Sequence, residues 1–312
     1  MTDREKLLDD LRPLAFRVAY RMLGSVSEAE DIVQEALLRV HQTLESGEEL
    51  ASPPAFVTTV ATRLAIDELR SARVRRELYV GEWLPEPIVT DDPDDPGRRA
   101  EIADSISMAM LLVLENLSPE ERAAFLLHDT FDYPYRDIAP IIGKSEDNVR
   151  QLASRARRHI GEHRPRFQTT REHQNELARR FFIAADTGDL AELEALLADD
   201  VVLTGDGGGK VPALARSLSG RSRVARTLHN WAKARKQIEG GVSFKLVDVN
   251  GGPGALILDA RERIAGALSL EIADGRITQV MSVVNPDKLA HIGVVANFNE
   301  LFGREAPSES KA

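Results

Sequence analysis

A run of polar and basic side chains between residues 145 and 158 has the types and spacing needed to bind DNA. Arginine can reach both phosphates and guanine edges, so an exposed row of arginines suits the major groove. The apolar residues of the same stretch recur at helical spacing and would face inward: Val149, Leu152, Ala153, Ala156 and Ile160. The outward face then holds the DNA-binding candidates Ser145, Asn148, Arg150, Gln151, Arg155, Arg157 and Arg158.

A helix-turn-helix would position these side chains. A short apolar helix is expected to end near Ile142, and Gly143 permits a left-handed turn because it has no Cβ. Ser145 then offers its hydroxyl as the N-cap of the second helix, whose N-terminus would face the DNA backbone. On this stretch alone, an ordinary helical hairpin with a solvated basic face remains an open alternative.

Length and composition bound the class of protein. The 312 residues suggest two or three domains, and the net charge of −10 is unusual for a DNA-binding protein. The acidic excess is concentrated in residues 81–104, which hold eight acidic side chains and two arginines. The absence of cysteine excludes disulfides and thiolate metal sites, and we expect no metal or cofactor. No apolar run approaches about 18 residues, so we expect a soluble, cytoplasmic protein.

The first 80 residues read as helices, one of which carries an acidic face. Ser27 to Glu30 form a capping-box pattern that predicts a helix start. In the helix that follows, a group of acidic and amide side chains surrounds an exposed leucine and makes a candidate partner surface: Asp31, Gln34, Glu35 and Leu38.

A second helix start is expected at Ser52-Pro53, and the helix that follows has a basic end. Arg63, Asp67 and Arg70 share one of its faces at offsets of four and seven residues. Further basic candidates for DNA binding are Arg73, Arg75 and Arg76. A solvated, ion-paired face explains Arg63, Asp67 and Arg70 equally well, so both interpretations remain open.

Three motifs together resemble the extracytoplasmic-function (ECF) class of bacterial sigma factors. They are residues 28–40, residues 60–70 and the helix-turn-helix, and the resemblance covers about the first 165 residues. It implies that the helix carrying Asp31 to Leu38 docks on core RNA polymerase. It also implies that residues 53–76 and the loop before them open the minus-ten promoter element, and that the helix from Ser145 reads the minus-thirty-five element. Many relatives have Asn at the position of Arg63 and Arg at that of Leu152, so base contacts do not transfer there.

Residues 81–97 have the composition of an interdomain linker, with four prolines and six acids. Such a segment favours an extended chain that repels itself. A solvated tether does not account for Trp83 and Leu84, because large exposed apolar side chains in a linker usually have a docking site.

Beyond about residue 172, helices precede a series of strands. Helices are expected at 174–186, 189–198 and 221–236, and strands at 242–249, 254–260, 265–273 and 276–284. This order predicts an α+β cone with one curved antiparallel sheet. It resembles the SnoaL-like domain that one subgroup of these sigma factors carries at its C-terminus. Three segments carry that resemblance, residues 83–87, 206–210 and 285–289. We expect a regulatory, interdomain role for residues within them: Trp83, Leu84, Asp206, Lys210, Asn285, Asp287 and Lys288.

The predicted fold class is therefore multidomain, with two all-α sigma domains and a C-terminal α+β cone. We expect a core-binding and minus-ten domain at 1–80, a linker at 81–104 and a helix-turn-helix domain at 105–168. A SnoaL-like domain is expected at 169–303 and a polar tail at 304–312.

An enzymatic cone was considered and set aside. Acid–base chemistry in its pocket would need a carboxylate or histidine, and none of the candidates has a spacing that demands catalysis: Asp206, Asp248, Asp259, His229 and His291. Asp259, next to Arg261, is more simply an ion pair within the sheet. Asp206 to Lys210 lack the full phosphate-loop pattern, so a turn or an interdomain contact is the better interpretation.

The predicted function is that of an alternative sigma factor, not an enzyme. It binds core RNA polymerase and promoter DNA, and its C-terminal domain modulates activity in cis and carries a pocket for an unknown small molecule. The alternative is a stand-alone DNA-binding regulator with a ligand-sensing domain. A requirement for core polymerase would distinguish the two classes.

Overall fold

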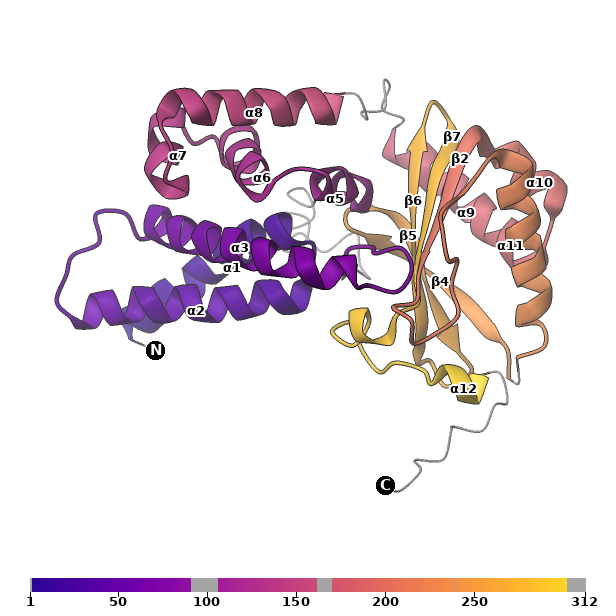
Figure 1. The fold of residues 1–312 in the computed structure, drawn as a ribbon. Helices are drawn as coiled ribbons and strands as arrows, with labels where there is room; N and C mark the ends of the chain where they lie inside the picture. Colours follow the sequence, from indigo (N-terminus) through magenta and orange to yellow (C-terminus); the bar gives the residue numbers. More distant parts are fainter. Residues whose placement is uncertain (1, 91–105, 162–169, 239, 302–312) are drawn as a thin grey trace. The chain divides into compact units, whose positions relative to one another are not determined.

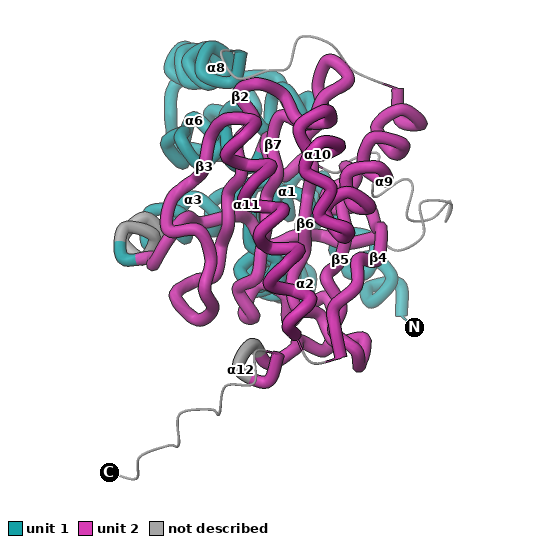
Figure 2. Tube along the Cα trace, turned by 90° about the vertical axis from the view of Figure 1, so that its right-hand side faces the viewer, with its two compact units in different colours: residues 1–78, 111–164 teal, residues 79–110, 165–312 magenta. Residues whose placement is uncertain are grey.

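The computed structural model describes residues 2–90, 106–161, 170–238 and 240–301, without the side chains of residues 72–77, 298 and 299. The chain forms two compact units. Unit 1 comprises residues 1–78 and 111–164, and unit 2 comprises residues 79–110 and 165–312 (Figure 2). No helix in the described ranges has both the length and the apolar character needed to cross a membrane.

The first three helices of unit 1 pack along one another (Figure 1): α1 (Asp3–Leu23), α2 (Val26–Glu45) and α3 (Pro53–Glu77). Gly24 ends α1 in the left-handed region, with φ 66°. The predicted cap at Ser27 is wrong, because Ser25 caps α2 and accepts from the Glu28 backbone N–H at 3.2 Å. Gly24 has already turned the chain, so the next residue takes the extended conformation of an N-cap.

The helix-turn-helix and the helices before it form the other half of unit 1, apart from the first residues of α5, which belong to unit 2. Its elements are α5 (Met108–Glu115), α6 (Pro119–Phe125), a π-helical turn (Leu126–Thr130), α7 (Tyr135–Ile142) and α8 (Glu146–Gly161). Ser118 and Glu121 form a capping box at the start of α6, and the predicted left-handed turn at Gly143, with φ 66°, is confirmed. All five predicted inward residues of α8 are buried, so the basic face points outward.

Unit 2 is built on one sheet with the strand order β1-β4-β5-β6-β7-β2-β3. The strands are β1 (Val89–Thr90), β2 (Leu197–Asp206), β3 (Leu218–Ser219), β4 (Val242–Val249), β5 (Gly252–Asp259), β6 (Ile264–Ala273) and β7 (Arg276–Val283). Three helices cover one face of the sheet (Figure 1): α9 (Arg171–Thr187), α10 (Leu190–Leu196) and α11 (Arg221–Arg235). A 3₁₀ turn (Pro286–Lys288) and α12 (Phe298–Leu301) follow the last strand.

The hairpins of the sheet follow local turn chemistry. The β4–β5 turn is Asn250-Gly251 and the β6–β7 turn is Asp274-Gly275, and all four residues have positive φ. Two-residue turns of this kind match the twist of antiparallel strands. Two features were not predicted: β2 pairs with β7 in parallel, and the linker supplies β1, which pairs with β4. The predicted class, helical domains followed by an α+β domain with a curved sheet, is confirmed.

Candidate functional site

Asp206, at the end of β2, is the centre of a buried site where the linker meets the sheet. Its side chain is fully buried. Its Oδ1 accepts from the Tyr79 hydroxyl at 2.6 Å and the Gly208 N–H at 3.0 Å, and its Oδ2 accepts from the Leu84 N–H at 2.9 Å. Burial, reinforced by the bond to Asp206, raises the pKa of Tyr79 and keeps its hydroxyl proton in place as a donor.

Lys288 completes this site. Its Nζ lies 2.7 Å from Asp206 Oδ2 and 2.5 Å from the Leu84 carbonyl oxygen. It also lies 4.3 Å from the Trp83 ring centroid and 4.9 Å from that of Tyr79. A buried ammonium is tolerated only when paired and hydrogen-bonded, and Lys288 is just 6% exposed. We call the group Tyr79, Trp83, Leu84, Asp206, Asn285 and Lys288 the linker latch.

The glycines after Asp206 make room for the linker. Gly208 has φ 60°, and a Cβ on it would lie 2.2 Å from Asn285 Nδ2. A Cβ on Gly209, with φ 71°, would lie 3.0 Å from the Cβ of Val80. The predicted turn at 206–210 is therefore present, and its glycines are needed both for the positive φ and for the close approach of the chain.

Asn250 contacts the linker, and the sequence did not predict this contact. It is buried in the β4–β5 turn, where its Oδ1 accepts from the Ile88 N–H at 3.0 Å. Its Nδ2 donates to the Ile106 carbonyl at 3.1 Å, and its backbone N–H donates to the Ile88 carbonyl at 2.8 Å. One side chain thus holds both ends of the linker. The Asn-Gly turn pattern explained Asn250 locally, and nothing in the sequence indicated a second role for its amide.

The remaining predicted interdomain residues lie at the edge of the latch. Lys210 Nζ and Asp287 Oδ2 are 2.5 Å apart, but their side chains are 53% and 64% exposed. Surface pairs of this kind contribute about 0–1 kcal/mol. The structure therefore brings all seven predicted residues together within unit 2, while their regulatory role remains a prediction.

The five residues considered for catalysis are held in other contacts. Asp248 pairs with Arg171, His229 contacts the Gly188 carbonyl and His291 contacts the Pro87 carbonyl. Asp259 pairs with Arg263 at 2.7 Å, so the predicted partner, Arg261, is wrong, and Arg261 contributes only its backbone N–H. None of the five lines the cavity of unit 2 described below. Within the described ranges, no three His, Cys, Asp or Glu side chains gather as a metal ion would require.

Acidic residues restrain three of the arginines on the outward face of α8. Arg150 lies 2.5 Å from Glu146, Arg155 lies 3.1 Å from Glu121 and Arg157 lies 2.7 Å from Asp129. Hydrogen bonds to Asp129 and Tyr135 raise the pKa of Arg157. A guanidinium has five N–H donors, so each arginine keeps donors for a further ligand while its side chain is oriented.

The other polar candidates on α8 are exposed. The Ser145 hydroxyl caps the helix and accepts from the Asn148 backbone N–H at 3.3 Å. Within the described part of the chain, the side chains of Asn148, Gln151 and Arg158 make no hydrogen bond or ion pair. Asn148 and Gln151 lie in the first turns of α8, the part of a recognition helix that reaches base edges.

The basic residues of α3 have divided roles. Arg63 donates to the Ile141 carbonyl at 3.0 Å and the Pro140 carbonyl at 2.8 Å, and both carbonyls lie at the end of α7. Arg70 pairs with Asp67 at 3.1 Å and with Glu120 at 2.7 Å, so the ion-paired interpretation is correct for Asp67 and Arg70 and not for Arg63. The side chains of Arg73, Arg75 and Arg76 lie outside the described part of the structure.

The predicted polymerase-binding face of α2 is exposed. Asp31 and Gln34 are accessible to solvent, Glu35 pairs with Arg39 at 2.7 Å and Leu38 is 48% exposed. The opposite face of α2 is buried and comprises Ala29, Ile32, Val33, Ala36 and Val40. The predicted partner surface is therefore accessible to solvent, and its role remains a prediction.

The fold is that of a DNA-binding transcription factor with a fused accessory domain. Helices α1 to α3, with the acidic face of α2, and the helix-turn-helix make up the first part, and the α+β domain is the second. Comparison with family models supports this class. The Sigma-70 region 2 model matches residues 7–75, and the Sigma-70, region 4 model matches residues 107–160.

Similar proteins extend the match to nearly the whole chain. The ECF RNA polymerase sigma factor SigJ of Mycobacterium tuberculosis is 38% identical over 293 residues, which cover 89% of this chain and 90% of SigJ. The probable ECF sigma factor SigI of the same species is 32% identical over 275 residues, covering 87% and 90% of the two chains. The crystal structure of M. tuberculosis SigJ superimposes with a TM-score of 0.72 at 35% identity, covering 90% of this chain and 96% of that one.

The chain therefore belongs to the ECF RNA polymerase sigma factors. Members of this family are initiation factors that bind core RNA polymerase and promoter DNA, and they act without bond chemistry. Family membership decides between the two predicted functions in favour of the sigma factor.

Proposed function

We propose that this protein directs RNA polymerase to a set of promoters in the cytoplasm and that its C-terminal domain modulates this activity in cis through the linker. The observation that carries the proposal is the linker latch, in which Asp206 and Lys288 of the C-terminal domain bind residues 79–84. Those residues directly follow α3, the helix that the family resemblance assigns to the minus-ten element.

The physical basis of this control is the anchoring of both linker ends. Residues 79–84 are held by the latch, and residues 89–90 are held by the pairing of β1 with β4. Ile106 is held by its hydrogen bond from Asn250. Glu271, on β6, adds hydrogen bonds to Ser107 and Ala109 at the start of α5. A tether fixed at both ends has fewer conformations than a free one, so the latch restricts how the DNA-binding elements on either side of it can separate.

Polymerase attachment is assigned to Asp31, Gln34, Glu35 and Leu38 on α2. Promoter contacts are assigned to the outward face of α8 and to the basic residues of α3. Arg63 donates from Nε and Nη2 to α7 carbonyls, so only its remaining N–H donors are left for DNA while these two bonds hold. A latch that changes the spacing of α3 and α7 would change the availability of Arg63 as well.

In vitro transcription with core polymerase tests the proposal. The full chain is compared with a chain cut near residue 168 and with an intact chain carrying Asp206→Asn, which weakens the latch without removing the domain. We expect both changes to alter promoter-specific transcription in the same direction, because both release the linker. Arg180→Ala is the matched control, since Arg180 is not among the predicted regulatory residues and its side chain, paired with Glu192, is 45% exposed.

Two outcomes separate the parts of the proposal. If the wild-type chain gives no promoter-specific transcription in the presence of core polymerase, the sigma function itself is contradicted. If the Asp206→Asn variant transcribes at the wild-type level although Trp83 fluorescence shows that its linker is released, modulation through the latch is contradicted. The sigma function is not affected by that outcome.

A further inference from the structure

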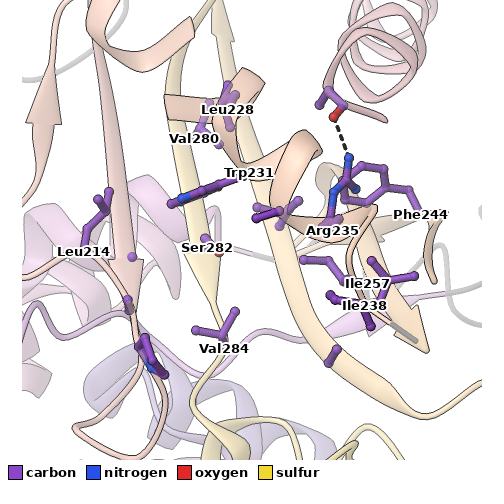
Figure 3. Close-up of a pocket in the computed structure, with 18 of the residues that line it drawn as sticks. Leu214, Leu228, Trp231, Arg235, Ile238, Phe244, Ile257, Val280, Ser282 and Val284 are labelled. Carbon is purple, nitrogen blue, oxygen red and sulfur yellow. Dashed lines mark hydrogen bonds between the residues drawn. The ribbon is translucent and has the colours of Figure 1, made fainter. Parts of the chain in front are cut away.

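Unit 2 contains an almost wholly apolar cavity of about 200 Å³ between the sheet and α11. Figure 3 shows Trp231 and Leu228 of α11 facing Val280 of β7, with Phe244 and Ile257 at the other end. A cavity of about 150 Å³ lined by apolar side chains can hold benzene. This space therefore fits one ring with a small substituent, or a branched chain of similar size.

Among the described residues that line this cavity, Arg235 carries the charge. The Arg235 guanidinium carbon lies 4.4 Å from the Phe244 ring centroid, and Nη2 donates to the Ala185 carbonyl at 2.6 Å (Figure 3). Its Nη1 is buried and has no hydrogen-bond partner in the described part of the chain. Nη2 also lies 3.6 Å from the exposed carboxylate of Asp186, which is beyond hydrogen-bond distance.

The environment of Arg235 favours an acceptor with negative charge. Burial lowers the pKa of Arg235, which shows that its positive charge is poorly solvated there. An unpaired buried N–H carries a desolvation penalty that an acceptor removes. A carboxylate matches a guanidinium better than a neutral group does, because the two planar groups form charge-assisted hydrogen bonds. Ser282, also in the lining, adds a hydroxyl that has no side-chain hydrogen bond within the described residues.

We propose that this cavity binds a small apolar carboxylic acid, with its ring or branched chain against Trp231 and Ile257 and its carboxylate on Arg235. The cavity is lined by residues of unit 2 alone, so the proposal does not depend on the proposed function. The ligand class follows from the volume, the apolar lining and the positive charge of Arg235.

Calorimetric titration of the full chain tests the proposal with 4-isopropylbenzoate and its neutral isostere, 4-isopropylbenzamide. We expect the acid to bind at least about tenfold more tightly than the amide, because only the acid carries a negative charge that can form an ion pair with the guanidinium. Arg235→Met keeps the length of the side chain and should reduce this ratio to about one. Arg226→Met is the matched control, since Arg226 is exposed on the same helix and outside the cavity. It should leave the ratio unchanged.

Ser282→Phe provides a second test that does not depend on the stability of the Arg235 variant. A phenyl ring at this position fills the cavity, so the acid and the amide should both lose binding. Equal affinity of the wild-type chain for acid and amide would overturn the proposal, as would no heat from the acid at millimolar concentration. Binding that survives Ser282→Phe would also overturn it, because the ligand would then lie elsewhere.

Discussion

Lys288 Nζ lies 2.7 Å from Asp206 Oδ2, and both side chains are almost completely removed from solvent. The two residues are 82 positions apart, and the linker residue Leu84 binds to both of them. Each charge therefore depends on the other and on the docked linker for its solvation. We therefore expect the latch to open as a whole, because an open arrangement must hydrate both charges.

Lys288→Met is expected to destabilise unit 2 and release the linker. Removing one partner of a buried ion pair leaves the other charge uncompensated and costs about 3–5 kcal/mol. The free energy of unfolding from chemical denaturation measures this loss, and Trp83 fluorescence should shift towards that of a hydrated indole. Lys210→Met should cost less than about 1 kcal/mol, because its pair with Asp287 is exposed. Equal effects of the two substitutions would contradict the assignment of Lys288 to the latch.

Asn250→Gly should loosen both ends of the linker without straining the turn. Glycine adopts the positive φ of residue 250 freely, so only the side-chain amide is lost. Loss of one hydrogen bond, worth about 1 kcal/mol, should speed amide exchange at Ile88 roughly fivefold. Asp274→Gly is the matched control, because Asp274 has the same φ of 52° in the other hairpin. Hydrogen exchange followed by mass spectrometry measures the effect, and unchanged protection at Ile88 would remove Asn250 from the linker site.

Glu271→Gln should stabilise unit 2 at neutral pH. Burial raises the pKa of Glu271, so the folded state holds its proton more tightly than the unfolded state does. Its stabilising contribution is therefore present below the unfolded pKa of about 4.3 and is lost as the pH rises through the folded pKa. Gln keeps an acceptor for Ser107 and Ala109 and carries no charge. Chemical denaturation at pH 4 and pH 7 should give Glu271→Gln a larger free energy of unfolding than wild type at pH 7 only. The same difference in unfolding free energy at both pH values would contradict this account.

Substitutions on α8 should separate phosphate contacts from base reading. Arg158→Ala should lower the slope of log affinity against log salt by about 0.9, whatever the promoter sequence. Gln151→Ala should instead relax specificity, by about 1–3 kcal/mol at one base pair. Promoter binding by the reconstituted holoenzyme measures both effects. Arg179→Ala is the control, because the Arg179 side chain is exposed on α9, outside the helix-turn-helix. Wild-type affinity and slope in both α8 variants would show that this face is only solvated.

Reversing charge at Asp31 should weaken attachment to core polymerase. Asp31 is exposed and, among the described residues, has no ion pair, so Asp31→Lys changes the surface without breaking an internal contact. Glu35→Lys should add to the effect, although it also frees Arg39. Titration of labelled protein with core polymerase measures the affinity, and Glu172→Lys on α9 is the control. Unchanged affinity of the double variant, with its fold intact, would exclude this surface.

Most helices and the basic outward face of α8 could be predicted from the sequence alone, because both depend on spacing over a few residues. Gly24, Gly143 and the Ser118 capping box marked helix ends through their own backbone chemistry. The inward residues of α8 were readable from helical periodicity, and their burial leaves the arginines outside. The motif resemblance supplied the family, which the comparisons with known proteins show.

Which distant groups form hydrogen bonds with one another depends on how the folded chain packs. Tyr79 and Asp206 are 127 residues apart, and no local pattern states that one donates to the other. The same holds for Arg63 on the α7 carbonyls, for the two linker ends on Asn250 and for the parallel pairing of β2 with β7. The cavity and its unpaired Arg235 N–H arise from the packing of α11 on the sheet. A buried polar group must find its partner wherever the folded chain places one, and that position is a property of the packed molecule.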